Sequence, residues 1–167
     1  MSDTIDSGNW LAERFAVSSS TAIDSIAAYL LSASPTDDAG KTFTIALYAD
    51  QGGLPALNLG QLYQATATYT QDGWTSVSSL GWQLNAGQYW VSLQGGDAAD
   101  SALYLQAPVG ATPAADAVAY YSGGARFSLT SSSETFGVQI SAVPEPGSLS
   151  LAVAGMGLLW WVQRRRS

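Results

Sequence analysis

The side chains that could carry chemistry in this chain are almost all carboxylates. Its 167 residues include 13 Asp and Glu, 6 Lys and Arg, and neither histidine nor cysteine. Nucleophile systems built on Ser-His-Asp or Cys-His, disulfides and histidine-bound zinc are therefore excluded. The chemistry that remains is cation binding by carboxylates, acid and base work by a carboxylate pair, and stacking of aromatic rings on sugars.

Loop carboxylates are one source of Ca²⁺ ligands, because Ca²⁺ takes several oxygens in flexible geometry. Asp97 with Asp100, or Asp50 with neighbouring carbonyls, would supply some of them. The chain lacks a complete ligand loop of the EF-hand type, and aspartates in loops are commonly turn formers in water. Structural Ca²⁺ stays open without a preferred loop; we predict no other cofactor and no metal-binding residue. The aspartates in predicted loops are Asp37, Asp38, Asp50, Asp72, Asp97 and Asp100.

Paired carboxylates are also the catalytic groups of most glycoside hydrolases. Glu13 and Glu134 are the only glutamates before residue 143, and neither stands in a recognisable motif. Because any two acids can be nominated as a pair, this pattern has little weight. We predict no catalytic residues and interpret the chain as a protein that is not an enzyme.

Aromatic residues would stack on sugar rings if they lay on an exposed sheet face. Burial is the other interpretation, because aromatic rings add a large apolar area to a core. Trp90 is the candidate glycan contact, since alternation puts it on the face opposite Val91 and Leu93 and we expect it to point outward. The aromatic residues concerned are Trp10, Trp74, Trp82, Trp90, Tyr48, Tyr63, Tyr69, Tyr104, Tyr120 and Tyr121.

The C-terminal stretch, residues 143–167, has three parts in a fixed order. The first part is Val143, Pro144, Glu145 and Pro146, and its prolines keep the chain extended because each fixes φ and disfavours helix in the preceding residue. Residues 147–162 follow without a charge and predict a single hydrophobic helix of about 24 Å, somewhat short of a hydrocarbon core of about 30 Å.

The far end of this segment carries the signals of a membrane boundary. Trp160 and Trp161 stand where indole rings favour the membrane interface, and Arg164, Arg165 and Arg166 close the segment. Such an arginine cluster predicts a cytoplasmic C-terminus, with everything upstream outside. The closing helix of a globular domain would need polar positions every third or fourth residue. Residues 147–162 lack this spacing, so a closing helix does not fit them. A plain tail anchor explains the helix and arginines, but not the Pro-Glu-Pro before them.

The order of these parts resembles the PEP-CTERM sorting signal of Gram-negative bacteria that export surface proteins alongside exopolysaccharide. The resemblance covers residues 143–167 alone. It implies recognition by exosortase, a membrane cysteine protease-transpeptidase that would cleave near the motif. Val143, Pro144, Glu145 and Pro146 would then be substrate residues, and the inner membrane would hold the chain transiently before its release to the cell surface or extracellular matrix.

Upstream of this stretch, short alternating segments are separated by turn residues. Residues 41–49 are the clearest strand, with Phe43, Ile45 and Leu47 on one face. The pattern of residues 22–32 fits either a strand or a helix. Eight or nine strands spaced by about 10 to 15 residues are typical of an antiparallel β-sandwich, which we expect to be jelly-roll-like. Residues 46–55 and 84–93 are also similar to choice-of-anchor β-sandwich ectodomains, which often precede this sorting signal.

Three parts are therefore predicted: a flexible polar segment over 1–10, a β-sandwich ectodomain over 11–142, and the sorting signal over 143–167. Twelve acids against three basic residues leave the part before the motif at about −9, which argues against binding to nucleic acid, anionic lipid or anionic polysaccharide. Residues 1–8 lack the basic and apolar regions of a signal peptide, so we expect a missing upstream segment.

Together these features predict an exported, non-catalytic surface or matrix protein with a structural or adhesive role alongside exopolysaccharide. Its expected partners are exosortase, the inner membrane and exopolysaccharide. The alternative is a carbohydrate-binding module that uses exposed aromatic residues. A row of aromatic residues on one sheet face would favour the module, whereas tryptophans buried between the sheets would favour the structural role.

Overall fold

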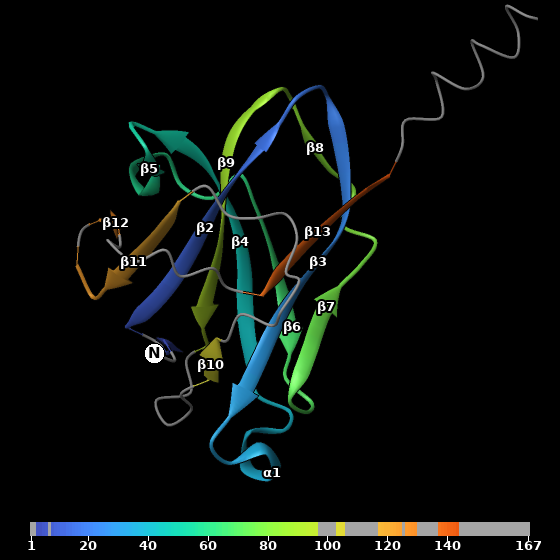
Figure 1. Ribbon diagram of the computed structural model, residues 1–167, viewed down its shortest axis with the longest axis vertical. Helices are drawn as coiled ribbons and strands as arrows, with labels where there is room; N and C mark the ends of the chain where they lie inside the picture. The colour runs from blue at the N-terminus through green and yellow to red at the C-terminus, as the bar shows by residue number, and fades with distance from the viewer. Residues whose placement is uncertain are drawn as a thin grey trace, which may run out of the picture.

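Two antiparallel β-sheets make up the described part of the chain (Figure 1). The computed structural model describes residues 3–6, 8–96, 103–105, 117–124, 126–129 and 137–143. The all-β, antiparallel class expected from the sequence is confirmed over these residues. The hydrophobic helix predicted after residue 146 lies outside them.

The first sheet is organised around the long strand β3, which pairs along both of its edges. Ile26 and Ala28 in β3 each have one partner in β13 and another in β7, so these two strands flank β3 on opposite sides. β8 pairs with the first residues of β3 and β10 with its last residues, while β1 adds to β10. The strands are β1 (Asp3–Ile5), β3 (Thr21–Ser32), β7 (Gly73–Val77), β8 (Trp82–Leu84), β10 (Leu103–Leu105) and β13 (Val138–Val143).

The second sheet runs in the order β12, β11, β2, β9, β4, with β5 and β6 both pairing with β4. Its strands are β2 (Asn9–Val17), β4 (Thr42–Gln51), β5 (Leu54–Pro55), β6 (Tyr63–Thr68), β9 (Gly87–Gly95), β11 (Val118–Ser122) and β12 (Ser128–Leu129). The helical elements are α1 (Pro35–Asp38) and the 3₁₀ turn η1 (Leu57–Leu59). Among the described residues no helix has the length and apolar character needed to cross a membrane.

The structure decides two points that the pattern left open or predicted differently. Residues 21–32 form a strand, because pairing along both edges satisfies the backbone of β3 over most of its length. Within residues 1–10, predicted to be a flexible segment, the described residues 3–5 and 9–10 lie in strands instead. β1 pairs there with β10, and β2 already begins at Asn9, where its pairing with β11 starts.

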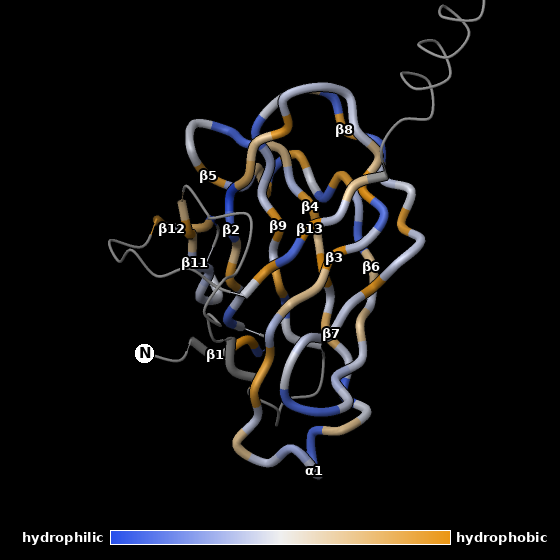
Figure 2. The backbone as a smooth tube through the Cα atoms, turned by 45° about the vertical axis from the view of Figure 1, so that its right-hand side comes forward, coloured by the Kyte–Doolittle hydropathy of each residue, from blue (hydrophilic) through white to orange (hydrophobic). Residues whose placement is uncertain are grey.

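The main hydrophobic core lies between the two sheets. Alternating residues of each strand point into it, as the period of a β-strand requires: Phe43, Ile45 and Leu47 in β4 are all at most 1% exposed, as predicted. Figure 2 shows the corresponding hydrophobic segments along β4 and β9. Trp82 is also buried between the sheets, stacked on Tyr63 with the ring centroids 5.4 Å apart.

A second hydrophobic cluster covers the other face of the second sheet. We call this the outer cluster; its buried members come from β2, β4, β9 and β11, with Phe127 from the segment before β12, and Leu54 and Leu57 pack against it. The second sheet is therefore buried on both faces over much of its area. The buried members are Ala12, Ala46, Tyr48, Trp90, Ala119 and Phe127.

One carboxylate points into the main core. Glu13 lies between Leu11 and Phe15 on the inward face of β2, is paired in register with Val91 and Val118, and is 4% exposed. Its Oε2 atom has no hydrogen-bond partner. Burial raises the pKa of Glu13 from 4.5 to about 8, because a charged carboxylate is much less stable in an apolar environment than in water.

Replacing Glu13 by Gln should stabilise the folded chain increasingly as the pH rises. The folded chain keeps a proton on Glu13 that the unfolded chain releases above pH 4.5, so this contribution is complete below pH 4.5 and is lost as the pH rises to about 8. Each pKa unit corresponds to about 1.4 kcal/mol, so Glu13→Gln should gain a few kcal/mol over wild type between pH 4 and pH 8.

Urea unfolding at pH 4, 6 and 8 measures this difference. Asp37→Asn, a change at an exposed carboxylate, is the matched control and should follow wild type. If Glu13→Gln and wild type keep the same difference in unfolding free energy at every pH, Glu13 is not protonated in the core.

Replacing Trp90 by Ala should lower the free energy of unfolding far more than removing an exposed side chain does. Trp90 is 0% exposed in the outer cluster, and truncating a buried tryptophan costs about 3–5 kcal/mol through lost burial and the cavity it leaves. Leu59→Ala, at a side chain that is 70% exposed, is the control. A loss for Trp90→Ala as small as the loss for Leu59→Ala would contradict the buried outer cluster.

Candidate functional site

The predicted sorting motif begins where the described residues end. Val143 is the last residue of β13 and is paired in register with Ala22 in β3. Pro144, Glu145 and Pro146 follow outside the described residues, as do Trp160, Trp161, Arg164, Arg165 and Arg166. The backbone of the first sheet therefore reaches the first residue of the motif.

Trp90, predicted to point outward as a glycan contact, is buried, and that prediction is wrong. Alternation correctly assigned it to the face of β9 opposite Val91, but the outer cluster covers this face and leaves Trp90 0% exposed. Its indole Nε1 donates a 2.7 Å hydrogen bond to Oδ1 of Asp50, and the Cζ atom of Arg14 lies 5.6 Å from the ring centroid. The ring is thus enclosed by packing and polar contacts.

Asp50, one of the candidate Ca²⁺ ligands, is engaged by donors of the protein itself. Besides the bond from Trp90, its Oδ2 accepts a 3.1 Å hydrogen bond from the backbone N–H of Gly53, and Nη1 of Arg14 lies 3.7 Å from Oδ1. These contacts tie the turn after β4 to β9 and β2. We interpret Asp50 as a residue that fixes this turn.

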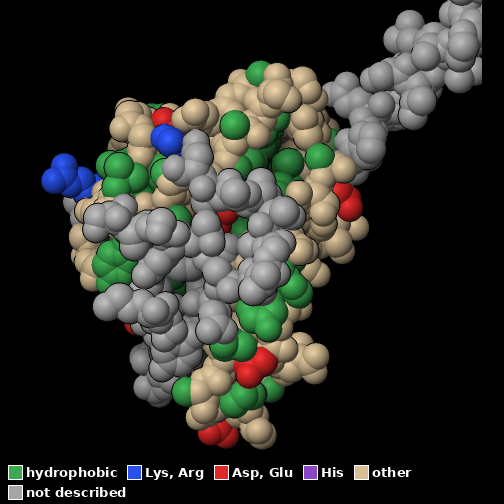
Figure 3. Space-filling view, in the orientation of Figure 1, with side chains coloured by type: hydrophobic (Ala, Val, Ile, Leu, Met, Phe, Trp, Pro, Cys, Tyr) green, Lys and Arg blue, Asp and Glu red, His purple; other side chains and the backbone are tan. Residues whose placement is uncertain are grey.

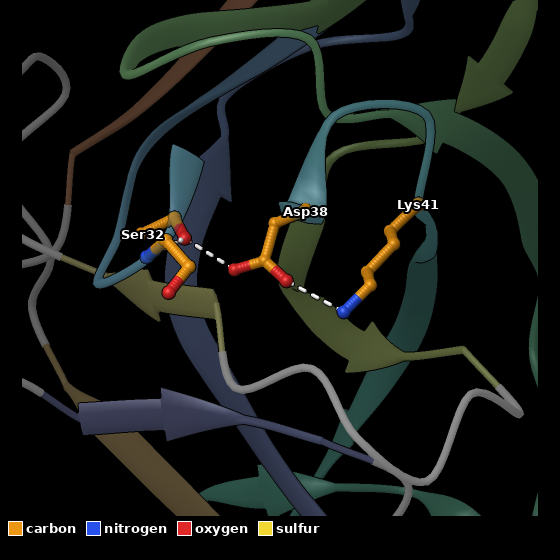
Figure 4. Close-up of polar contacts among 4 residues, drawn as sticks. Ser32, Asp38 and Lys41 are labelled. Atoms are coloured by element: carbon orange, nitrogen blue, oxygen red, sulfur yellow. Dashed lines mark hydrogen bonds and ion pairs between the residues drawn. The ribbon is translucent and has the colours of Figure 1, made fainter. Parts of the chain in front are cut away.

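Asp38, at the opposite end of the fold, also has protein partners (Figure 4). Lys41 Nζ donates a 2.6 Å hydrogen bond to Asp38, and the Ser32 hydroxyl donates to the other oxygen of the same carboxylate. The ammonium of Lys41, with the Ser32 hydroxyl, holds the pKa of Asp38 below its ordinary value. This network joins α1 to the end of β3 and the start of β4.

Asp72 closes a second link at this end. Its Oδ1 accepts hydrogen bonds from the Tyr69 hydroxyl at 2.5 Å and from the backbone N–H of Ser32 at 2.9 Å. Burial, together with the Asp72 carboxylate, raises the pKa of Tyr69 to about 12, so this hydroxyl remains a donor in neutral solution. The turn between β6 and β7 is thereby clamped to the end of β3.

The structure brings no metal-binding group of acids together in the part of the chain that it describes. No three Asp or Glu side chains there lie close enough to hold one ion. Asp97 and Asp100 fall outside the described residues.

A groove of about 220 Å³ opens between β2, β3 and the end of β13. It is smaller than the roughly 300–1,000 Å³ of typical small-molecule sites. Its lining is mostly apolar and carries no charged group: Phe15, Ala16, Val17, Ser18, Thr21, Ile23, Ile140 and Ala142. The groove offers little to orient a polar ligand.

Trp74 is the described tryptophan that solvent reaches most, with 41% of the side chain exposed. It lies on the outward face of β7, opposite Tyr29 of β3, and the two rings meet edge to face with centroids 5.4 Å apart. The sequence pattern pointed to Trp90 rather than Trp74 as the glycan contact. The alternation in β7 also indicates that Trp74 faces outward, because its neighbours Thr75 and Val77 are the residues of this strand that face the core.

The chain has the fold of part of a known surface protein. No family model and no curated protein matches it. It is similar to the crystal structure of the cysteine protease and lectin-like domains of Cwp84, a surface layer associated protein of Clostridium difficile, with TM-score 0.60 and 15% identity over 83% of this chain and 33% of that chain. A variant of this protease after propeptide cleavage matches with the same TM-score and identity, over 84% of this chain and 36% of the other. The chain thus spans about a third of the structures it resembles, and at this identity the likeness concerns the fold alone.

Proposed function

We propose that this chain is an exported, non-catalytic surface or matrix protein with a structural or adhesive role alongside exopolysaccharide. Exosortase recognises residues 143–146, and the hydrophobic segment holds the chain in the inner membrane, with the arginines on the cytoplasmic side, until cleavage. The residues of the motif act as a substrate. The β-domain before it is the part that is delivered.

The observation that carries this proposal is the position of β13. The strand ends at Val143, the first residue of the motif, and its pairing with β3 runs from Val143 back to Val138. Cleavage just after residue 143 would therefore leave both sheets with all their described strands. A processing site inside β13 would instead remove part of the strand that pairs with residues 22–28 of the central β3.

Two further features agree with a structural or adhesive role. Trp82 and Trp90 are buried and contribute to packing, which is the arrangement expected if the tryptophans hold the domain together. The fold is also similar to that of a chain from a surface layer associated protein.

Carbohydrate binding by the β-domain is the second candidate function. It is favoured by the exposure of Trp74 beside Tyr29, and the protein of similar fold carries a lectin-like domain. A plain tail-anchored protein is the remaining alternative, and it differs from our proposal in keeping its C-terminus.

The mass of the mature protein from a host with and without exosortase tests the sorting proposal. With exosortase, we expect a C-terminus within residues 144–147, because the enzyme cleaves near the motif. Changing Pro144, Glu145 and Pro146 together to Ala should prevent this cleavage and keep Arg164 to Arg166 in the product. The control changes Ser148 and Ser150 to Ala and should be cleaved like wild type.

A product that keeps the arginine cluster in both hosts would reduce the segment to a membrane anchor. A product that loses it in both hosts would point to a different protease. Either result would contradict sorting by exosortase.

A further inference from the structure

We propose that the outward face of the first sheet binds a neutral polysaccharide, with Trp74 as the stacking ring. This face, which we call the Trp74 face, comprises Tyr29, Ala27, Ser25, Trp74, Ser76, Gln139 and Ser141. The inference deepens the second candidate function, since it names the surface and the class of ligand. It does not depend on the sorting mechanism.

The register of three strands builds the Trp74 face in rows. Trp74 of β7 stands beside Tyr29 of β3. In the next row, Ala27 of β3 has Ser76 on one side and Gln139 of β13 on the other. Ser25 and Ser141 make the third row. The exposed aromatic ring therefore stands at one end of a strip of small and polar side chains.

The side chains between these positions point the other way and hold the strip in place. Ile26 and Ala28 of β3, and Val138 of β13, are buried in the main core, and Thr75 of β7 is also buried. The Trp74 face is thus the solvent side of a sheet whose inner side is packed into the main core at these positions. Its side chains are exposed or half-buried, so a ligand would reach them without any rearrangement of the core.

Trp74 is held in position by contacts that do not use its exposed surface. Asp72, two residues earlier, accepts hydrogen bonds from Tyr69 and from the backbone of Ser32, which fixes the start of β7 against the end of β3. Gly73, which stands between Asp72 and Trp74 in the sequence, has φ +122°, a conformation that other residues rarely adopt. Tyr29 then supports the indole from the side. A ring fixed in this way loses little conformational freedom on binding, which favours affinity.

The chemistry of the Trp74 face selects its ligand. None of its seven side chains is charged, and it combines one aromatic surface with hydroxyl groups and an amide. An uncharged polysaccharide presents matching groups, namely apolar ring faces for the indole and hydroxyls for serine and glutamine. A polyanion would be repelled by a domain with a net charge of about −9. In Figure 3, the visible Lys and Arg side chains lie to the upper left, away from β3 and β7.

Binding is measured with the full chain in a detergent that has no sugar headgroup. Affinity electrophoresis in gels that contain a β-glucan, an α-glucan, a mannan or a galactan provides the neutral ligands, and alginate provides the anionic one. We expect at least one neutral polysaccharide to retard the chain and alginate to leave its mobility unchanged. Trp74→Ala should weaken the neutral binding about tenfold or more, because the stacking contact and its buried area are lost.

Two variants separate stacking from other causes. Trp74→Phe keeps an aromatic ring and should retain part of the affinity. Leu59→Ala removes an exposed apolar side chain from η1, which belongs to neither sheet, and should bind like wild type. The urea-unfolding midpoint of each variant checks that the fold is intact.

The inference is overturned if wild type binds none of the neutral polysaccharides, or if Trp74→Ala binds as well as wild type. It is also overturned if alginate binds as tightly as the neutral ligands. A shift from dimer to monomer in Trp74→Ala, measured by light scattering, would identify the face as a contact between two copies of this chain. None of these results affects sorting, because the mass of Trp74→Ala from a host with exosortase tests cleavage separately.

Discussion

The pairing of β3 along both edges is the constraint on which the rest of this structure depends. Its inward residues, Ile26, Ala28 and Leu30, are 0% exposed and form the centre of the main core. Its outward residues carry the Trp74 face. One of its neighbours, β13, is the strand that leads into the proposed sorting motif. Core packing, a candidate binding surface and the proposed processing site are therefore all coupled to one strand.

The second sheet differs from the first, because much of both its faces is covered. The inward residues of β4 and β9 meet the main core, and their outward residues enter the outer cluster. Burying Trp90 and Tyr48 there requires polar partners for their tips: Asp50 accepts from the indole, and Gln94 donates to the Tyr48 hydroxyl at 2.9 Å. Not every polar atom in this sheet is satisfied, since Ser92 Oγ and Trp10 Nε1 have no partner. An unpaired buried polar atom lowers stability.

Glu13 shows how this packing interacts with solution conditions. Its carboxyl is surrounded by β-strand partners that are apolar, so the neutral form is the one the core accommodates. Asp38 is the opposite case, because Lys41 and Ser32 donate hydrogen bonds to its carboxylate and lower its pKa. Asp72 accepts hydrogen bonds from the Tyr69 hydroxyl and from the backbone N–H of Ser32. Acids of the same sequence thus serve opposite purposes. Those at the end of the fold link its turns, whereas Glu13 is buried among apolar side chains, where its neutral form is favoured.

The sequence by itself determined the local properties of this protein. Alternation in residues 41–49 identified β4 and its inward residues, and the turn residues separated most strands correctly. The absence of histidine and cysteine removed whole classes of chemistry. These features depend on neighbours within a few residues, which is why a single chain reveals them.

Only the tertiary structure decided which face of each strand is covered. Alternation separates Trp90 from Val91, and Glu13 from Arg14, but it does not say which side of the sheet meets other parts of the chain. Trp90 is buried in the outer cluster, which includes Phe127 and against which Leu54 and Leu57 pack, and all three residues are far from it in sequence. Trp74 remains exposed on the outward face of the first sheet, where its main ring contact is Tyr29. Burial is set by long-range packing. The structure therefore identifies Trp74, and not Trp90 as the sequence had suggested, as the candidate binding residue.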